Sequence, residues 1–330
     1  MKFQARKAHH CPHAGRKPLI MWLGATLAAL LLGAPPLAQP EPDRNVYILL
    51  SDVSSHYSLV ARTIADTLKQ QHAEGSVAIG TLMGTPPIAL NGDTLIIAVG
   101  TKATRRAITE HPGKPLLSLF LTRSAWRNLS EEAGADGRRA VVFLDNPPRR
   151  LFYLASLIKP EARRIGTVFG PVSQAYKRPL RDAMAGTHYQ LIAADLTHQD
   201  NPVARLTPVI ENSDLFLALP DRAFFNRNVA KWILYLSFRN KIPVIGFSES
   251  YTRAGALASL YSSAADIGRQ GAELAESYLR SPADFHWRSF DPAYFSIEIN
   301  PAVARALDME LPTPETLRLA IEKLEEAAEP

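Results

Sequence analysis

The sequence predicts an α/β fold with two lobes, each built on a parallel β-sheet, and three observations support this. From Asn45 onward, short β-rich apolar runs alternate with helical patterns about a dozen residues long, which is typical of βαβ units. The alternation comes in two series, separated by Asp145-Asn146-Pro147-Pro148. The chain of 330 residues, 46% of them hydrophobic and 21% charged, is long enough to bury two cores.

The first 38 residues have the pattern of a secretory leader. Basic residues precede an apolar run from Leu19 to Leu32, and small residues follow it up to Ala38. The run is shorter than the roughly 20 residues that cross a bilayer, so the pattern favours a cleaved leader over a permanent anchor. The only cysteine, Cys11, lies before the apolar run and would leave with the leader. We therefore expect cleavage after Ala38 and a soluble periplasmic protein.

The charge balance argues against nucleic acid as a partner. The whole chain carries 37 Lys and Arg against 32 Asp and Glu, a net charge of +5. Residues 1–38 hold five of these basic residues and no acidic one, so residues 39–330 are neutral. A neutral chain without a long basic run lacks the charge that binding to a phosphate backbone requires.

The first series predicts one sheet with helices between most of its strands. A helix after the first strand is indicated by apolar residues at helical spacing, among them Leu59, Val60, Ile64 and Leu68, and the next helix begins near Lys102. Core packing accounts for all of these apolar residues. The expected strands are Val46 to Leu50, Ser76 to Ile79, Thr94 to Val99, Leu116 to Leu121 and Ala140 to Leu144.

The second series repeats the pattern and predicts a second lobe. Helices are expected near Ser173, Pro202 and Asn226. The expected strands are Ile165 to Phe169, Tyr189 to Ala193, Leu215 to Leu219 and Val244 to Phe247.

The remaining chain predicts that the lobes are joined by several crossings. Paired prolines restrict the backbone before them, so Asp145 to Pro148 is the first candidate hinge. We expect the first lobe to comprise residues 43–146 and about 256–290, and the second lobe residues 147–255 and about 291–312. Residues 313–330 are expected to form a surface helix. The later elements are expected to be a strand at Gly255 to Tyr261, a helix at Ala264 to Leu279 and a strand at Tyr294 to Ile299.

Motifs that would indicate an enzyme or a metal site are missing from the sequence. It has no GxSxG, no GxxxxGK[ST], no HExxH, no paired CxxC and no GxGxxG after a strand. His9, His10, Cys11 and His13 resemble a metal cluster but fall in the expected leader. We predict no catalytic residue, no metal and no cofactor. The other histidines are scattered without helical pairing, at His56, His72, His111, His188, His198 and His286.

Candidate ligand-binding residues follow from the position of ligands in parallel sheets, which bind outside the carboxyl ends of the strands. Side chains directly after the predicted strands are rich in hydroxyl, aromatic and charged groups. In the first lobe the candidates are Ser51, Asp52, Ser54, Tyr57, Gly100, Thr101, Arg123 and Trp126. In the second lobe they are Ser173, Tyr176, Asp221, Arg222 and Glu249.

Each candidate has a structural alternative. Ser and Thr at helix starts suit a ligand carboxylate but equally cap the helices. Tyr57, Trp126, Tyr176 and Tyr251 are placed to sandwich a ligand or to pack within their own lobe. An ammonium group would suit Asp52, Asp221 or Glu249. Arg123 and Arg222 follow strands on opposite lobes and either clamp a carboxylate or pair with acidic side chains across the closed cleft.

Several stretches resemble the substrate-binding proteins of ABC transporters, specifically the tryptophan/tyrosine type. They are Ala98-Val99-Gly100-Thr101, Pro160 to Gly166, Lys241 to Gly246 leading to Ala254 to Ala258, Ala265 to Gly271, and Asn300-Pro301. The likeness runs from about Val46 to Leu311. It implies a type I periplasmic-binding-protein fold, with two Rossmann-like lobes, and pocket roles for Gly100, Thr101 and Asp221. It also implies a membrane permease as partner and a monomeric state.

The leading functional hypothesis is therefore capture of a small organic ligand, such as an amino acid or another small carboxylate, for delivery to an ABC importer. A periplasmic sensory subunit that reports its ligand to a membrane kinase or receptor would use the same lobe closure. An enzyme with an Asp or Glu as general base is the least favoured alternative.

Overall fold

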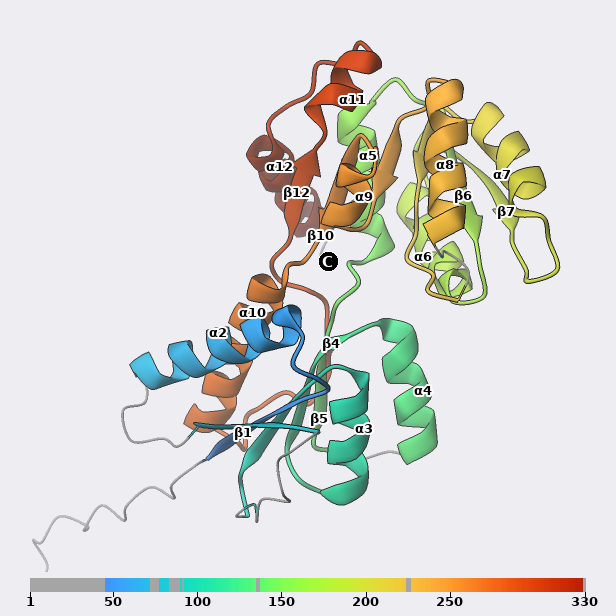
Figure 1. Cartoon of the computed structure of the whole chain (residues 1–330). Helices are drawn as coiled ribbons and strands as arrows, with labels where there is room; N and C mark the ends of the chain where they lie inside the picture. Colours follow the sequence, from blue (N-terminus) through green and yellow to red (C-terminus); the bar gives the residue numbers. More distant parts are fainter. Residues whose placement is uncertain are drawn as a thin grey trace, which may run out of the picture. The chain divides into compact units, whose positions relative to one another are not determined.

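The computed structural model describes residues 45–71, 77–82, 90, 92–134, 137–223 and 227–328. The expected leader, with Cys11 and its neighbouring histidines, lies outside these residues. Within the described residues the strands form two six-stranded sheets with helices on both faces, which confirms the predicted α/β class (Figure 1). We call each sheet with its helices a lobe.

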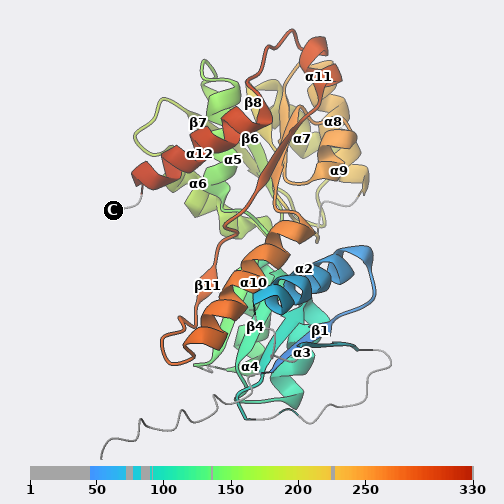
Figure 2. The same ribbon diagram turned by 90° about the vertical axis from the view of Figure 1, so that its left-hand side faces the viewer.

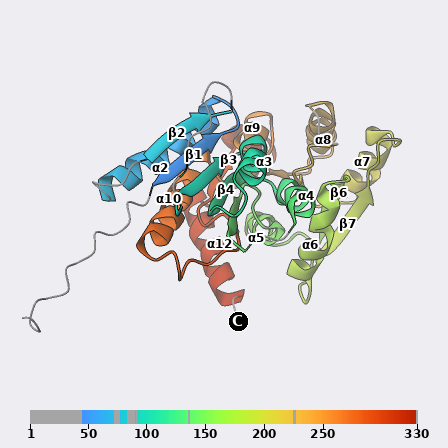
Figure 3. The same cartoon turned by 90° about the horizontal axis from the view of Figure 1, so that it is seen from below.

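The first sheet has the strand order β11-β5-β4-β3-β1-β2 and is parallel throughout. Helices α2 (Ser55–Gln71) and α10 (Ala264–Arg280) cover one face, and α3 (Thr101–Glu110) and α4 (Arg123–Ala133) cover the other (Figure 3). The strands are β1 (Val46–Leu50), β2 (Val77–Thr81), β3 (Leu95–Val99), β4 (Leu116–Leu121), β5 (Arg139–Phe143) and β11 (Ser289–Phe290).

The second sheet has the order β12-β10-β9-β8-β6-β7, in which β12 alone runs antiparallel among the described strands. Its strands are β6 (Arg164–Phe169), β7 (Gln190–Asp195), β8 (Leu215–Leu217), β9 (Val244–Gly246), β10 (Ala258–Tyr261) and β12 (Ser296–Ile299). Helices α5 (Pro148–Ile158), α6 (Lys177–Met184), α11 (Pro301–Ala306) and α12 (Pro314–Ala328) contribute to one core. Helices α7 (Pro202–Glu211), α8 (Arg227–Arg239) and α9 (Glu249–Arg253) contribute to the other.

Burial explains why the central strands were recognisable as apolar runs. A parallel sheet covered on both faces requires continuous apolar sequence, and every residue of β1 and β3 is buried. The edge strand β7, in contrast, has no fully buried residue. Hydrophobic burial therefore defines the middle of each sheet and leaves the edges less constrained.

The chain returns to the first lobe later than expected. The sequence placed this crossing near residue 256, but β10 pairs with β9 and β12 in the second sheet, so the return follows Tyr261. Helix α10 then lies beside α2 (Figure 2). A β-carbon at Gly271 would lie 2.5 Å from a methyl carbon of Leu119, so this glycine lets α10 approach β4 closely.

The proline pair lies at the expected break between the two series, after β5 of the first sheet, and it also begins α5 of the second lobe. Pro147 occupies the N-cap of α5 and Pro148 its first turn, where a missing N–H is tolerated. The expected C-terminal helix is present as α12, which buries Leu317 and Ile321 in the core of the second lobe. Among the described residues, no helix is long and apolar enough to cross a membrane.

Candidate functional site

Both sheets reverse their strand order at a corresponding position, and this marks where a ligand is expected. In the first sheet the reversal lies between β1 and β3, and in the second sheet between β6 and β8. Ligands of open parallel sheets bind outside the carboxyl ends of the strands at such switch points. Ser51 and Gly100 follow the two strands of the first switch point, and Gly170 follows β6 at the second.

The first switch point is a tight junction built around Gly100. The Ser51 hydroxyl accepts a hydrogen bond from the Ala103 amide at 2.9 Å and so caps α3 from the neighbouring strand. Gly100 has a φ of 88°. A β-carbon there would lie 2.7 Å from Ser51 Oγ and 2.8 Å from the Tyr57 hydroxyl. Glycine is therefore required both by the backbone conformation and by the close approach of these two side chains.

Polar groups at this edge are left for a ligand. Helix α3 has no side-chain cap at Gly100 itself, and the half-buried Thr101 hydroxyl has no hydrogen-bond partner among the described residues. Asp52 is exposed and accepts from the Ser54 amide at 2.8 Å, which lowers the pKa of its carboxyl. Burial raises the pKa of the Tyr57 phenol, which stays protonated as a donor. The helix start and the two hydroxyls suit a ligand carboxylate, whereas the ionised Asp52 suits an ammonium group.

Phe120 lies at the same edge and is not among the site residues predicted from the sequence. The pairing register of β4 with β5 shifts between Leu119 and Leu121, and Phe120 has a φ of 63°, which is rare for an aromatic residue. Its ring meets Tyr57 edge-on at 5.5 Å and His56 at 6.4 Å. Because strand alternation gives no sign of a register shift, nothing in the sequence marks this residue.

Arg123 pairs with the acidic side chains of Asp145 and Asp291. Its amide donates to Asp145 Oδ1 at 2.9 Å, its Nε lies 3.6 Å from Asp145 Oδ2, and its guanidinium also pairs with Asp291. Both partners lie in segments that link the lobes. Trp126 packs partly buried on the core of its own lobe, beside Leu121 and Leu129.

In the second lobe, Asp221 is used internally. It is 2% exposed and accepts hydrogen bonds from the amides of Val172 and Ser173 at 2.9 and 2.7 Å, and from the Ser173 hydroxyl at 2.9 Å. Its other oxygen accepts from the Ala223 amide at 3.1 Å. The carboxylate therefore holds the loop after β6 against the loop after β8.

Ser173 is thus the second-lobe candidate that bonds to Asp221, and the remaining candidates have other surroundings. Tyr176 is buried and donates to Asp145 Oδ2 at 2.5 Å. Burial is the main cause of the raised pKa of the Tyr176 phenol, with the charge of Asp145 second. Arg222 and Glu249 are exposed, and Glu249 pairs with Arg253 on α9. Tyr251, also considered for ligand stacking, is buried in the core.

The segments that link the lobes are hydrogen-bonded to one another. The Asn146 amide group donates to Ser262 Oγ at 3.1 Å, and that hydroxyl donates to the Tyr294 carbonyl at 2.7 Å. Buried Arg150 donates to Asn146 Oδ1 at 2.8 Å and to the Pro292 carbonyl at 2.6 Å. Burial raises the pKa of the Asp145 carboxyl in this region, although the bond from Tyr176 opposes the rise.

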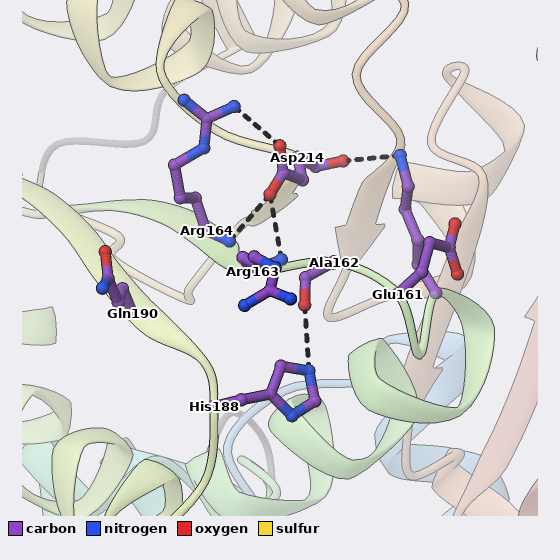
Figure 4. Close-up of a pocket in the computed structure, with 8 residues that line it drawn as sticks. Glu161, Ala162, Arg163, Arg164, His188, Gln190 and Asp214 are labelled. Atoms are coloured by element: carbon purple, nitrogen blue, oxygen red, sulfur yellow. Dashed lines mark hydrogen bonds and ion pairs between the residues drawn. The ribbon is translucent and has the colours of Figure 1, made fainter.

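A surface pocket of about 650 Å³ lies at the opposite edge of the second sheet, at the amino ends of β6 and β7 (Figure 4). Asp214 binds the amides of Arg163 and Arg164 and pairs with the Arg164 guanidinium at 2.8 Å. These bonds, above all that from Arg164, lower the pKa of Asp214 to about 2. Because this pocket lies at the wrong end of the strands, it is separate from the candidate ligand site. It is lined by Lys159, Glu161, Ala162, Arg163, Arg164, His188, Gln190 and Asp214.

No grouping of three or more His, Cys, Asp or Glu that could hold a metal ion occurs in the described part of the chain. Comparison with known proteins gave no matching family model, and no curated protein matched. Solved structures, however, match over most of their length.

Three of these structures show the extent of the likeness. A substrate-binding protein with adhesive properties from Clostridium difficile, in its ligand-free open structure, is 16% identical with a TM-score of 0.64, covering 82% of this chain and 97% of its own. A conserved domain protein from Vibrio cholerae is 19% identical with a TM-score of 0.54, covering 84% and 98%. An ABC domain from Streptococcus pneumonia in complex with L-Trp is 15% identical with a TM-score of 0.53, covering 84% and 98%. The chain thus has the fold of the type I periplasmic binding proteins.

Proposed function

We propose that the protein is a periplasmic solute-binding protein that captures a small organic ligand at the carboxyl edges of its two sheets and delivers it to an ABC importer. The observation that carries the proposal is the pair of matching switch points on sheets that are linked by several chain segments. Bending of a few linking residues brings such edges together over a ligand without any covalent chemistry. The protein acts as a binder and not as an enzyme.

The ligand we propose carries a carboxylate, as amino acids do. The start of α3 offers backbone N–H groups, because the N-cap residue Gly100 has no side chain that could bind them. The Thr101 hydroxyl and the exposed Lys102 lie at the same helix start. The positive end of the helix dipole favours an anionic group there. The rings of Tyr57 and Phe120 lie beside this position and suit the apolar body of the ligand.

The direct test is thermal unfolding of the purified protein with a panel of small molecules. The protein is unfolded and refolded first to remove any ligand carried from the cell. A ligand at about 100 times its Kd stabilises the folded state by roughly 2.7 kcal/mol, which raises the Tm by several degrees. Amino acids and small carboxylates are expected to give the shift and to be recovered unchanged. A chemically altered ligand would contradict the proposal, as would a refolded protein that responds to none of the panel.

Thr101→Val tests the assigned position of the carboxylate. The substitution keeps the side-chain shape and removes the hydroxyl, so ligand affinity is expected to fall about tenfold, with little change in the Tm of the free protein. Thr109→Val is the matched control, because Thr109 is exposed near the other end of α3 and bonds only to carbonyls of its own helix. Equal affinities in the two variants would remove Thr101 from the site.

A further inference from the structure

Helix α8 carries a row of exposed aromatic side chains that its packing does not require. Trp232, Tyr235 and Phe238 are 42%, 50% and 70% exposed and recur every third residue along the helix. The inner face of α8 is already buried in the second lobe through Val229, Ile233 and Leu236. Exposed aromatic clusters of this kind mark interaction surfaces.

The aromatic side chains are accompanied by polar and basic groups. Trp232 and Tyr235 meet edge-on at 5.8 Å, and the Arg239 guanidinium lies 5.8 Å from the centre of the Tyr235 ring. A shallow groove of about 500 Å³ is lined by Asn228, Lys231, Trp232 and Tyr235. We call this surface the α8 face: Asn228, Lys231, Trp232, Tyr235, Phe238 and Arg239.

The segment that carries the α8 face has charges of one sign. Between residues 222 and 248 the sequence holds five basic residues and no acidic one, although residues 39–330 as a whole are neutral. The neighbouring α7 adds one residue of each sign, Arg205 and Glu211, and Arg205 is paired with Asp200. A local excess of positive charge beside exposed aromatic rings therefore distinguishes this face from the rest of the protein.

We propose that the α8 face binds the surface of an anionic phospholipid bilayer. Tryptophan and tyrosine favour the boundary between headgroups and acyl chains, where the ring is buried and its polar atom stays hydrated. Lysine and arginine beside them pair with lipid phosphates. Phe238 is the most exposed of the three rings, and the face offers no carboxylate. A flat anionic surface fits these properties better than a partner protein does. A partner protein would have to supply acidic side chains opposite the lysine and arginine of the α8 face.

Such binding would be shallow and reversible, because it uses a few side chains of one helix. It would keep the protein close to the membrane. The inference does not depend on the proposed function, since it rests on α8 alone.

Flotation with lipid vesicles tests the proposal. The full chain is expressed in a bacterial host, and mass spectrometry establishes that the purified wild type and variants share one N-terminus. Vesicles of phosphatidylglycerol with phosphatidylethanolamine are compared with vesicles of phosphatidylcholine alone. We expect binding to the anionic vesicles that weakens as salt is raised, and about fivefold less binding for W232S/Y235S/F238S and for K231Q/R239Q.

The control removes exposed apolar side chains from another helix of the same lobe. Leu319 and Leu324 on α12 are 46% and 38% exposed, so L319S/L324S is expected to bind vesicles as the wild type does. Equal loss in this control, equal binding to phosphatidylcholine, or full binding by both α8 variants would overturn the proposal. The proposal would also be overturned if the wild type bound no vesicles but associated with itself or with an acidic protein, and both α8 variants abolished that association. The charge variant keeps the test valid if the aromatic variant misfolds.

Discussion

The carboxyl edges of the two sheets have the same strand arrangement, but their polar side chains differ in how far they are hydrogen-bonded within the protein. At the first switch point, Ser51 supplies one hydrogen bond to α3, and the Thr101 hydroxyl has no partner among the described residues. At the second, the buried Asp221 carboxylate accepts hydrogen bonds from the loop after β6 and from its own loop. The first lobe thus has a hydroxyl donor without a protein partner at its switch point, and the second lobe has a carboxylate that is bonded within the protein.

This difference assigns different roles to residues that occupy corresponding positions. A carboxylate that is buried and surrounded by donors stabilises its loops, and its removal leaves those donors without partners. A helix start with one cap, from Ser51, and a nearby unbonded hydroxyl contributes less to folding and can bind an anionic group. We therefore expect substitutions at the second edge to affect stability first, and substitutions at the first edge to affect ligand binding.

The strongest test of the comparison pairs Asp221→Ala with Ser51→Ala. Loss of the Asp221 carboxylate leaves three amides and one hydroxyl without their acceptor, so the free energy of unfolding is expected to fall by about 3 kcal/mol. Loss of the single Ser51 cap is expected to cost about 1 kcal/mol. Urea denaturation of both variants measures the difference. Equal losses would show that the two edges do not differ in the way described.

Gly100→Ala tests the tight junction at the first edge. An alanine there must adopt a positive φ and push Ser51 and Tyr57 aside, so stability is expected to fall by about 2 kcal/mol and ligand binding to weaken. Gly186→Ala is the control, because Gly186 has a φ of 74° with nothing within 4 Å of the new carbon. Its cost is expected to be about 1 kcal/mol, from the backbone alone. Denaturation curves that coincide would exclude the close approach as a cause.

Tyr176→Phe tests the bond between the second lobe and the linking segment. Burial raises the pKa of Asp145, so the folded state holds that proton more tightly than the unfolded chain does. Stability from this group therefore falls as pH rises from the ordinary value of 3.8 to the raised value. The hydrogen bond from the Tyr176 hydroxyl lowers the pKa of Asp145. Without that hydroxyl the pKa of Asp145 rises further, so stability falls by more as the pH is raised.

The expected cost of Tyr176→Phe is about 1 kcal/mol at neutral pH and less near pH 4, where Asp145 is protonated more readily. Tyr189→Phe is the control, since the Tyr189 hydroxyl donates only to the Pro160 carbonyl, at 3.3 Å, in an exposed position. Unfolding free energies measured across this pH range give the comparison. A loss that does not change with pH would separate Tyr176 from the titration of Asp145.

Much of the fold could be predicted because buried parallel strands leave a strong apolar signal. The predicted bounds of Val46–Leu50 and Leu116–Leu121 are those of β1 and β4. The apolar residues of a short strand do not indicate which strands it pairs with. The sequence therefore placed β10 in the first lobe, whereas it pairs with β9 and β12 of the second sheet. The two residues of β11 were too few to be recognised.

The candidate site was only partly accessible from sequence. The rule for strand ends selected Ser51, Gly100 and Thr101, which the structure brings to one switch point. The same rule selected Asp221 at the second edge. It could not show that the Asp221 carboxylate accepts hydrogen bonds from the protein's own loops, where a ligand carboxylate could otherwise bind. Arg123 and Asp291 are 168 residues apart, and no local pattern relates them.

The packing of α2 against α10 also bears on when the protein can fold. Residues 55–71 bury their apolar face against residues 264–280, so the first lobe lacks part of its core until most of the chain has been synthesised. The second lobe likewise waits for β12 and α12. Contacts so distant in sequence slow folding. A nascent chain of this topology therefore stays incompletely folded through most of its synthesis and exposes apolar surface to its surroundings until translation is nearly complete.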